Sequence, residues 1–179
     1  MLTVENTVLV VVDVQGKLAQ LMHDQEALFR NLQRMIRGAQ TLEVPILWCE
    51  QNPAGLGPTA PEIAGLLAPR QPLAKMSFSC WGCDAFQQAL QATGRQQVLL
   101  TGIEAHVCVY LTAADLVGAG YEVEVVADAV SSRSPENKRL ALGKVQGLPA
   151  ALTCTETALF QWLGTAAHPR FRDIARLLK

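Results

Sequence analysis

The sequence predicts an α/β domain in which helices cover both faces of a mainly parallel sheet. Apolar, β-branched runs alternate along the chain with segments of helical periodicity, which is the pattern of repeated βαβ units. The first run, residues 7–12, is continuously apolar, as in a strand buried on both faces. Half of the 179 residues are hydrophobic. We therefore expect one domain, residues 1–179, with a doubly wound, three-layer arrangement and strand order 3-2-1-4-5-6.

The individual elements follow from apolar spacing and from capping residues. Leu28, Leu32 and Met35 recur at helical spacing, and Ser134 followed by Pro135 is a typical helix start. The expected strands are residues 7–13, 45–49, 73–76, 97–100, 121–126 and 151–154. The expected helices are residues 25–43, 61–67, 84–92, 107–117, 155–162 with Thr155 as cap, 171–179, and one that begins at residue 135.

The segment between the second and third strands is long and rich in Pro and Gly. Residues 50–71 form either one wall of a ligand pocket or a plain surface loop. Asp128, after the fifth strand, is expected to be a turn or capping carboxylate.

Composition narrows the class of partner. The net charge is −1 and no Lys/Arg-rich run occurs, so we expect neither nucleic acid nor a membrane surface as partner, but a small molecule. The apolar run at residues 8–12 is too short for a membrane span or a secretory signal. Five cysteines without a secretory signal predict reduced thiols and a cytoplasmic location.

Cys108 is the first candidate for chemistry. It follows a buried strand and a Gly turn, at the first turn of the helix expected over residues 107–117. Free backbone N–H groups and the positive end of the helix dipole favour a thiolate there, and they are able to hold an oxyanion. The competing interpretation is a small core residue, because cysteine among Val, Ala and Leu is usually buried for packing.

Two further polar residues are expected near Cys108. Asp13 ends the first strand and Lys75 ends the third. In a doubly wound sheet, strands one and four are neighbours at the switch point, where ligands bind at the carboxyl ends. Asp13 and Cys108 then open onto the same crevice, and Lys75 is able to lean in from two strands away.

Three segments in this order resemble the isochorismatase-like cysteine hydrolases. Residues 11–15 (VVDVQ) resemble the family's opening motif, residues 75–79 (KMSFS) its lysine segment and residues 102–109 (GIEAHVCV) its nucleophile segment. Residues 50–59 are similar to a loop in a poorly characterised, metal-free branch. The resemblance covers nearly the whole chain and implies a Rossmann-like isochorismatase fold.

The resemblance also implies a site and an activity. It implies a catalytic triad of Asp13, Lys75 and Cys108, and a cis peptide bond between Ile103 and Glu104. The backbone N–H groups of Glu104 and Cys108 would form the oxyanion hole. The implied reaction is hydrolysis of a small amide-like C–N substrate through a thioester, without a cofactor, in a homo-oligomer that is a dimer or larger.

Departures from the family pattern limit the substrate. Ala105 stands where many members carry Thr, and the region after the second strand lacks the Asp/His metal cluster of nicotinamidases. The three histidines, His23, His106 and His168, are widely spaced, so no bound metal is expected. True isochorismatases lack the cysteine, so Cys108 argues against isochorismate as the substrate.

Pocket residues and two alternative functions remain open at this stage. Side chains that would line the pocket and bind a flat substrate are Gln15, Trp48, Phe78, Trp81 and Tyr110. One alternative is thiol redox chemistry at Cys80 and Cys83, a C-x-x-C pair before a helix. The other is a catalytically idle member of the fold that serves in binding or assembly.

Overall fold

A six-stranded parallel sheet forms the centre of the computed structural model, which describes residues 1–179. The strand order is β3-β2-β1-β4-β5-β6, so the predicted fold class and strand order are confirmed. The strands are β1 (Thr7–Val12), β2 (Ile46–Gln51), β3 (Leu73–Lys75), β4 (Gln97–Ile103), β5 (Glu122–Ser131) and β6 (Ala150–Thr153).

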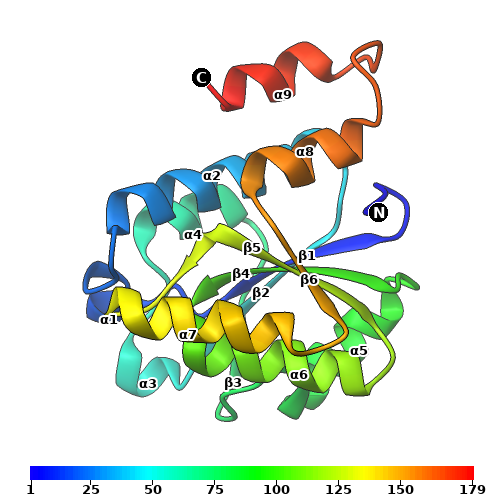
Figure 1. Ribbon diagram of the computed structural model, residues 1–179. Helices are drawn as coiled ribbons and strands as arrows, with labels where there is room; N and C mark the ends of the chain where they lie inside the picture. The colour runs from blue at the N-terminus through cyan, green and yellow to red at the C-terminus, as the bar shows by residue number, and fades with distance from the viewer.

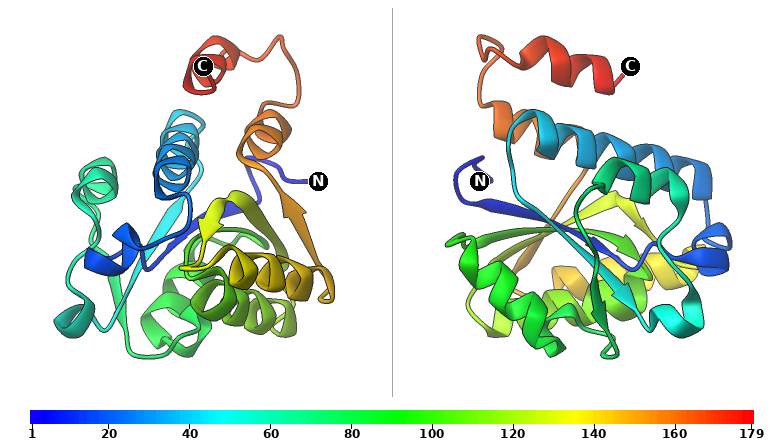
Figure 2. Two further views of the ribbon diagram at one scale, coloured as in Figure 1. Left: turned by 60° about the vertical axis from the view of Figure 1, so that its left-hand side comes forward. Right: turned by 180° about the vertical axis from the view of Figure 1, so that it is seen from behind.

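Helices cover both faces of the sheet and make three layers (Figure 1). One face carries α2 (Gln25–Thr41), α4 (Pro61–Leu67) and α8 (Thr155–Leu163), with α9 (Phe171–Leu177) outside them. The other face carries α5 (Asp84–Ala92), α6 (Tyr110–Gly118) and α7 (Pro135–Gln146), as the two turned views in Figure 2 also show. The short helices α1 (Gly16–Gln20) and α3 (Pro53–Leu56) lie beyond the carboxyl ends of the strands, at the left in Figure 1.

Successive side chains of β1 point to opposite faces of the sheet and enter two separate hydrophobic cores. Leu9 and Val11 belong to the core under α2 and α8, whereas Val8, Val10 and Val12 belong to the core under α5 and α6. All six residues of β1 are buried because both of its faces are covered. This central position places the residue after β1 at the middle of the carboxyl edge.

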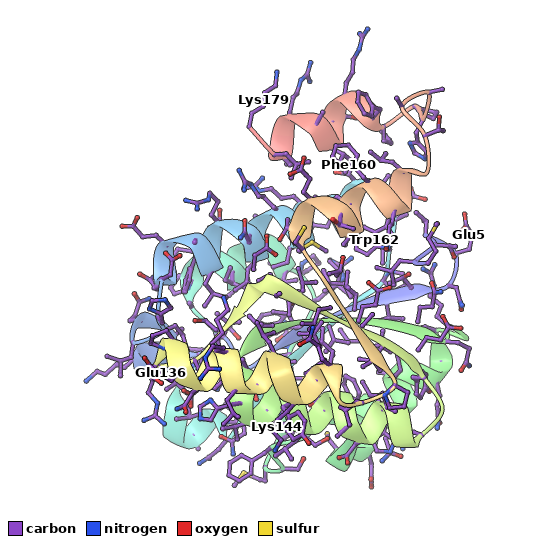
Figure 3. The ribbon with its side chains drawn as sticks, in the orientation of Figure 1. Glu5, Glu136, Lys144, Phe160, Trp162 and Lys179 are labelled. Carbon is purple, nitrogen blue, oxygen red and sulfur yellow. The ribbon has the colours of Figure 1, made fainter.

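The outermost helix packs through aromatic contacts. Phe160 of α8 lies on the side that faces α9, where its ring is 6.4 Å from that of Phe171, and Trp162 lies on the opposite side, toward the sheet (Figure 3). None of the helices has the length and apolar character needed to cross a bilayer.

Several predicted boundaries differ from the structure. β5 continues to Ser131, beyond the end predicted at residue 126, and its register with β4 shifts between Leu100 and Gly102. Thr155 is not the cap of α8. Cys154 occupies that position, and the Oδ1 oxygen of Asp128 accepts hydrogen bonds from Thr155 N (2.8 Å) and Oγ1 (2.9 Å). Asp128 is thus a capping carboxylate, as predicted, but from within a strand.

Candidate active site

A buried ion pair lies at the carboxyl edge of the sheet. Asp13 follows β1 with a left-handed backbone (φ 50°), and its N–H donates to the carbonyl of Cys49. Lys75 ends β3 and reaches past β2, so that its Nζ lies 2.6 Å from Asp13 Oδ2. The side chains of Lys75 and Asp13 are 1% and 3% exposed. A charge pair held this far from water is a costly arrangement, which is typical of a working site.

The ammonium group of Lys75 has no free proton. Besides Asp13 Oδ2, it donates to the backbone carbonyls of Ser77 (3.1 Å) and Phe78 (2.9 Å). Three donors thus meet three acceptors, which fixes the loop after β3 against the carboxylate. Burial acts to lower the pKa of Lys75, but neighbouring Cys80 and Asp13 outweigh it and raise the pKa, so the group stays charged.

Cys108 reaches the same edge from β4. Gly102 has φ 108°, and a Cβ atom there would lie 2.1 Å from the carbonyl oxygen of Val12, so only glycine allows β4 to pass β1 at this distance. The chain then forms a π-helical turn, Ala105–Val109, before α6. Cys108 therefore lies in a π turn and not in the first turn of an α-helix as predicted. Such single turns occur often at functional sites.

The electrostatics at Cys108 differ from the sequence-based prediction. Burial and the Asp13 carboxylate raise the pKa of the Cys108 thiol far above its ordinary value, and Lys75 offsets this only in part. The direction of this pKa shift favours a neutral thiol at rest, whereas the sequence-based expectation was a thiolate. Cys108 is only 8% exposed and faces the Asp13 carboxylate, and both conditions disfavour the charged form of the thiol.

Asp13 is suited to accept a proton. Burial raises the pKa of the Asp13 carboxyl, while Lys75 and the neighbouring Cys108 thiol act to lower it. Its Oδ1 oxygen is buried and has no hydrogen-bond partner within normal distance. A carboxylate with one oxygen held by a lysine and the other free beside a thiol is able to act as a base.

A cavity of about 220 Å³ joins Asp13 and Cys108. Four larger hollows, of about 520, 540, 320 and 420 Å³, lie elsewhere on the surface, and no cysteine lines any of them. The residues that line the 220 Å³ cavity are Asp13, Leu18, Gln51, Leu56, Phe78, Ile103, Glu104, Val107 and Cys108. The segment between β2 and β3 thus contributes a wall through Leu56, which favours the pocket interpretation of residues 50–71.

Glu104 closes the cavity next to Cys108. The peptide bond between Ile103 and Glu104 is cis, and the backbone N–H of Glu104 has no acceptor in the protein. The Glu104 side chain accepts from the Arg133 backbone N–H (3.2 Å) and from its Nε (3.0 Å). A free N–H group beside a nucleophile is the element from which an oxyanion hole is built.

Of the five side chains predicted to line the pocket, the structure brings only Phe78 to it. Gln15 instead fastens two loops, because its Nε2 donates to the carbonyls of Gln51 (3.0 Å) and Gly57 (2.8 Å). Trp48 is a core residue whose Nε1 donates to Thr59 Oγ1 (2.7 Å). Both predictions are corrected, because buried polar groups at these positions satisfy structural hydrogen bonds.

The other two aromatic residues are also corrected. Trp81 packs edge to face on Tyr121, with ring centres 5.6 Å apart. Tyr110 lies under the ammonium group of Lys144, 4.1 Å from its ring centre. Tyr110 therefore packs between α6 and α7, and Trp81 packs on the residue before β5, so both rings serve packing, which is the commoner use of aromatic side chains.

Sequence reasoning missed several residues of the cavity. Leu18 and Leu56 sit on the short helices α1 and α3, which are too brief to show a periodic signal. Gln51 lies two residues beyond the predicted end of β2. Val107 could have been predicted to line the cavity, because it directly precedes Cys108 in the segment that resembles the family's nucleophile motif.

The C-x-x-C pair lies outside the cavity. Cys80 is fully buried and Cys83 is partly exposed, where its thiol donates to the carbonyl of Ala74. His106 Nδ1 lies 2.9 Å from Ser132 Oγ and does not line the cavity. No three His, Cys, Asp or Glu side chains of residues 1–179 come together in an arrangement that would hold a metal ion.

The six-stranded parallel sheet, with a buried Asp–Lys pair beside a cysteine at its carboxyl edge, defines the class as a Rossmann-like α/β protein with an isochorismatase-type fold. The chain belongs to the isochorismatase-like hydrolase family, because residues 7–157 match the family model described as "Isochorismatase domain".

Relatives support this assignment along most of the chain. Isochorismatase domain-containing protein 2 of Danio rerio is 38% identical over 180 residues, covering 99% of this chain and 89% of the relative. The Macaca fascicularis protein of that name is 45% identical over 149 residues, covering 82% and 70%. A solved structure described as MAR1 ribonuclease from Caenorhabditis elegans superposes with a TM-score of 0.92 at 35% identity, covering 99% of this chain and 91% of that one.

Proposed function

We propose that this protein hydrolyses a small amide-like substrate at a C–N bond, with Cys108 as nucleophile, Asp13 as base and Lys75 as the fixed cation of a triad. One observation carries the proposal. The Lys75–Asp13 ion pair, with 2.6 Å between Nζ and Oδ2, borders the same cavity as the only cysteine that lines it. The free Oδ1 oxygen of Asp13 supplies the acceptor for the thiol proton.

The first step couples proton transfer to attack. Because the pKa of Cys108 is raised, the thiol keeps its proton until the substrate carbonyl arrives. The Sγ–C bond then forms as Asp13 Oδ1 takes the thiol proton, and the carbonyl π electrons move to oxygen. Lys75 keeps Asp13 ionised beforehand and stays paired with it throughout.

The oxyanion is held by backbone N–H groups. The N–H of Glu104, which has no acceptor in the protein, and the N–H of Cys108 would donate to it. Each such donor contributes roughly 3 kcal/mol of transition-state stabilisation in known hydrolases. When the intermediate collapses, Asp13 returns its proton to the leaving nitrogen, and the amine departs.

The second half-reaction restores the protein. Asp13, again ionised, takes a proton from water as the water oxygen attacks the thioester carbonyl. The C–Sγ bond breaks, the proton passes from Asp13 to the sulfur, and the carboxylic acid leaves. The net reaction consumes one water and yields an acid and an amine.

The ribonuclease name of the Caenorhabditis elegans relative suggests a different substrate. A phosphodiester would place a negative charge among the Asp13 and Glu104 carboxylates, while the Lys75 ammonium has no proton to spare. This environment opposes an anion and favours a neutral carbonyl compound. RNA is therefore a control substrate in the test below.

Detection of the thioester tests the proposed function. Wild-type protein is mixed with p-nitrophenyl acetate, and intact-mass spectrometry with peptide mapping locates the acyl group. We expect it on Cys108, and we expect Cys108→Ala to abolish acylation and amide hydrolysis. Cys83→Ala, which removes a thiol outside the cavity, serves as matched control with unchanged turnover.

Three results would overturn the proposed function. Acylation or amide hydrolysis that persists in Cys108→Ala would exclude Cys108 as nucleophile. Loss of activity in Cys83→Ala, with a reversible Cys80–Cys83 disulfide in wild type, would favour the redox alternative. If no acyl donor forms an acyl-enzyme, a catalytically idle binding protein would be favoured. If the protein cleaves RNA and this cleavage requires Cys108, a nuclease would be favoured.

We also propose that the chain assembles as a dimer or larger oligomer. The outer helices expose large apolar side chains, among them Leu111 of α6 and Leu140 of α7, which are 37% and 57% exposed. Such side chains are typical of interfaces when they group on one face. Sedimentation velocity at micromolar concentration is expected to show a species above 19.4 kDa, and a single monomer at all concentrations would contradict this.

A further inference from the structure

The walls of the active-site cavity are apolar. The apolar lining residues Leu18, Leu56, Phe78, Ile103 and Val107 come from four separate segments of the chain. At about 220 Å³ the cavity is below the usual range for drug-sized ligands, which is roughly 300–1,000 Å³. The part of a substrate that enters beside the thiol is therefore small.

Every polar side chain of the cavity, apart from the reacting atoms, already has a partner. Gln51 Nε2 donates to the carbonyl of Met76 (3.1 Å), and Glu104 accepts from Arg133. The Lys75 ammonium group donates hydrogen bonds to the Asp13 carboxylate and to the backbone carbonyls of Ser77 and Phe78. The donors that remain, the second N–H of Gln51 and the backbone N–H of Glu104, are neutral, and no lysine or arginine lines the cavity to pair with a carboxylate or a phosphate on the substrate.

We infer that the substrate is a neutral amide whose acyl group is a short, apolar, uncharged chain, with Phe78 as its specificity-determining residue. This inference rests on the proposed function and narrows its substrate class. An acyl group that carries a carboxylate would enter the cavity without a counter-ion and next to Asp13, which is strongly unfavourable. A branched aliphatic group would instead pack against the apolar lining side chains, among them Leu18, Leu56 and Phe78.

Phe78 is held in place from both sides. Its backbone carbonyl accepts from Lys75 Nζ, while the Ser77 hydroxyl donates to the carbonyl of Ser79 (2.8 Å). A Cβ on Gly82 would lie 2.8 Å from the Cβ of Ser77, so the loop also packs closely on the turn that follows it. The Phe78 side chain is nevertheless 56% exposed, which places it at the rim where the acyl chain enters.

The first experiment compares two probes of the same size, isovaleramide and malonamate, which differ by an isopropyl group in place of a carboxylate. Their binding to Cys108→Ala, which lacks the nucleophile, is measured by isothermal titration calorimetry. We expect isovaleramide to bind at least about 100-fold more tightly than malonamate, because the carboxylate loses its hydration without gaining a partner. Equal or tighter binding of malonamate would overturn the inference.

The second experiment tests Phe78. With wild-type protein, kcat/KM for isovaleramide is expected to exceed that for acetamide by more than about tenfold, since each buried methylene adds to discrimination. Phe78→Ala is expected to reduce kcat/KM for isovaleramide about tenfold while changing that for acetamide less than about twofold. Met76→Ala is the matched control, because Met76 is 72% exposed on the same loop and does not line the cavity.

The two proposals fail in distinguishable ways. If p-nitrophenyl acetate acylates Cys108 but malonamate is bound as well as isovaleramide, the hydrolase stands and the apolar substrate class is overturned. If no acyl donor modifies Cys108, the proposed function falls, and the calorimetric comparison in Cys108→Ala still decides whether the cavity prefers neutral ligands. If Phe78→Ala reduces kcat/KM by the same factor for isovaleramide and for acetamide, Phe78 has a structural role and does not determine specificity.

Discussion

Asp13 shows at the scale of a single residue how opposed effects are balanced in this site. Burial raises the pKa of its carboxyl, and Lys75 acts in the opposite direction. The same carboxylate raises the pKa of Cys108. The ion pair therefore lies beside a thiol whose pKa is raised, and the fold keeps both charged side chains almost fully buried.

Replacement of Asp13 is expected to separate thiol reactivity from hydrolysis. Asp13→Asn removes the negative charge that raises the Cys108 pKa and leaves Lys75, which lowers it. Alkylation of Cys108 by iodoacetamide near pH 7.5 is then expected to become at least about tenfold faster, while amide hydrolysis falls at least about 100-fold because the base is gone.

The measurement follows both rates in one protein sample. Mass spectrometry of peptides gives the alkylation rate of Cys108, and Cys83 in the same digest is the internal control because it lies outside the cavity. Slower alkylation of Cys108 in Asp13→Asn would show that Asp13 activates the resting thiol, contrary to the pKa direction given above.

Replacement of Lys75 is expected to cost stability in a pH-dependent way. Lys75→Met leaves the Asp13 carboxylate buried without its cation, which destabilises the fold by about 3–5 kcal/mol near pH 7. The folded-state pKa of Asp13 then lies further above its unfolded value of about 3.9, so the penalty is complete above the folded pKa and disappears as pH falls toward about 3.9.

Urea unfolding at several pH values measures this penalty. The double variant Asp13→Leu with Lys75→Met is the matched control, and it is expected to be close to wild type in stability and nearly independent of pH over this range. A Lys75→Met deficit that grew on acidification would contradict the assignment of Asp13 as the uncompensated charge.

At the scale of elements, the passage of β4 past β1 determines where Cys108 lies. Gly102 makes this approach possible, and the π turn Ala105–Val109 then directs Cys108 toward Asp13. The two strands meet in register from Thr7 with Gln97 to Val12 with Gly102. A change at Gly102 therefore affects the sheet and the site together.

Gly102→Ala is expected to destabilise the protein by at least about 3 kcal/mol or to prevent folding. The new Cβ would lie 2.1 Å from the Val12 carbonyl oxygen, and the positive φ is unfavourable for alanine. Gly143→Ala in α7 is the matched control, because nothing lies within 4 Å of the new Cβ there. It is expected to gain up to about 1 kcal/mol in urea unfolding. Equal stability of the two variants would contradict the steric argument.

At the scale of the whole molecule, the cavity that contains Asp13 and Cys108 and the helix α9 lie in different regions. α9 packs outside the helical layer formed by α2 and α8, as Figure 2 shows. Arg34 of α2 donates to the carbonyls of Leu177 and Leu178 and ties the end of the chain to that layer. No residue of α8 or α9 lines the cavity.

Removal of residues 165–179 is therefore expected to lower stability without changing catalysis. The truncation exposes surface now covered by Ile174, which is fully buried, and we expect a loss of about 3 kcal/mol in urea unfolding. The value of kcat/KM for an amide substrate is expected to stay within about twofold of wild type at 25 °C. A larger change in kcat/KM, in protein shown to be folded by circular dichroism, would contradict this separation.

The strand ends from which Asp13 and Lys75 extend could be predicted from the amino-acid sequence, and so could the strand order once the chain was assigned to a doubly wound sheet. Both follow from local information, because continuous apolar runs predict strands buried on both faces and parallel strands bring their carboxyl ends to one edge. Ser134 as a helix cap was equally local, and its hydroxyl accepts from the Asn137 N–H.

Only the tertiary structure decided the protonation of Cys108 and the shape of the cavity. A pKa depends on burial and on charges brought together from distant segments. Burial and the Asp13 carboxylate raise the pKa of the Cys108 thiol, which is opposite to the direction predicted from the sequence. The aromatic residues Trp48, Trp81 and Tyr110 pack against neighbouring segments and do not line the cavity. The cavity walls came instead from short helices such as α1 and α3, whose few residues carry no periodic signal of their own.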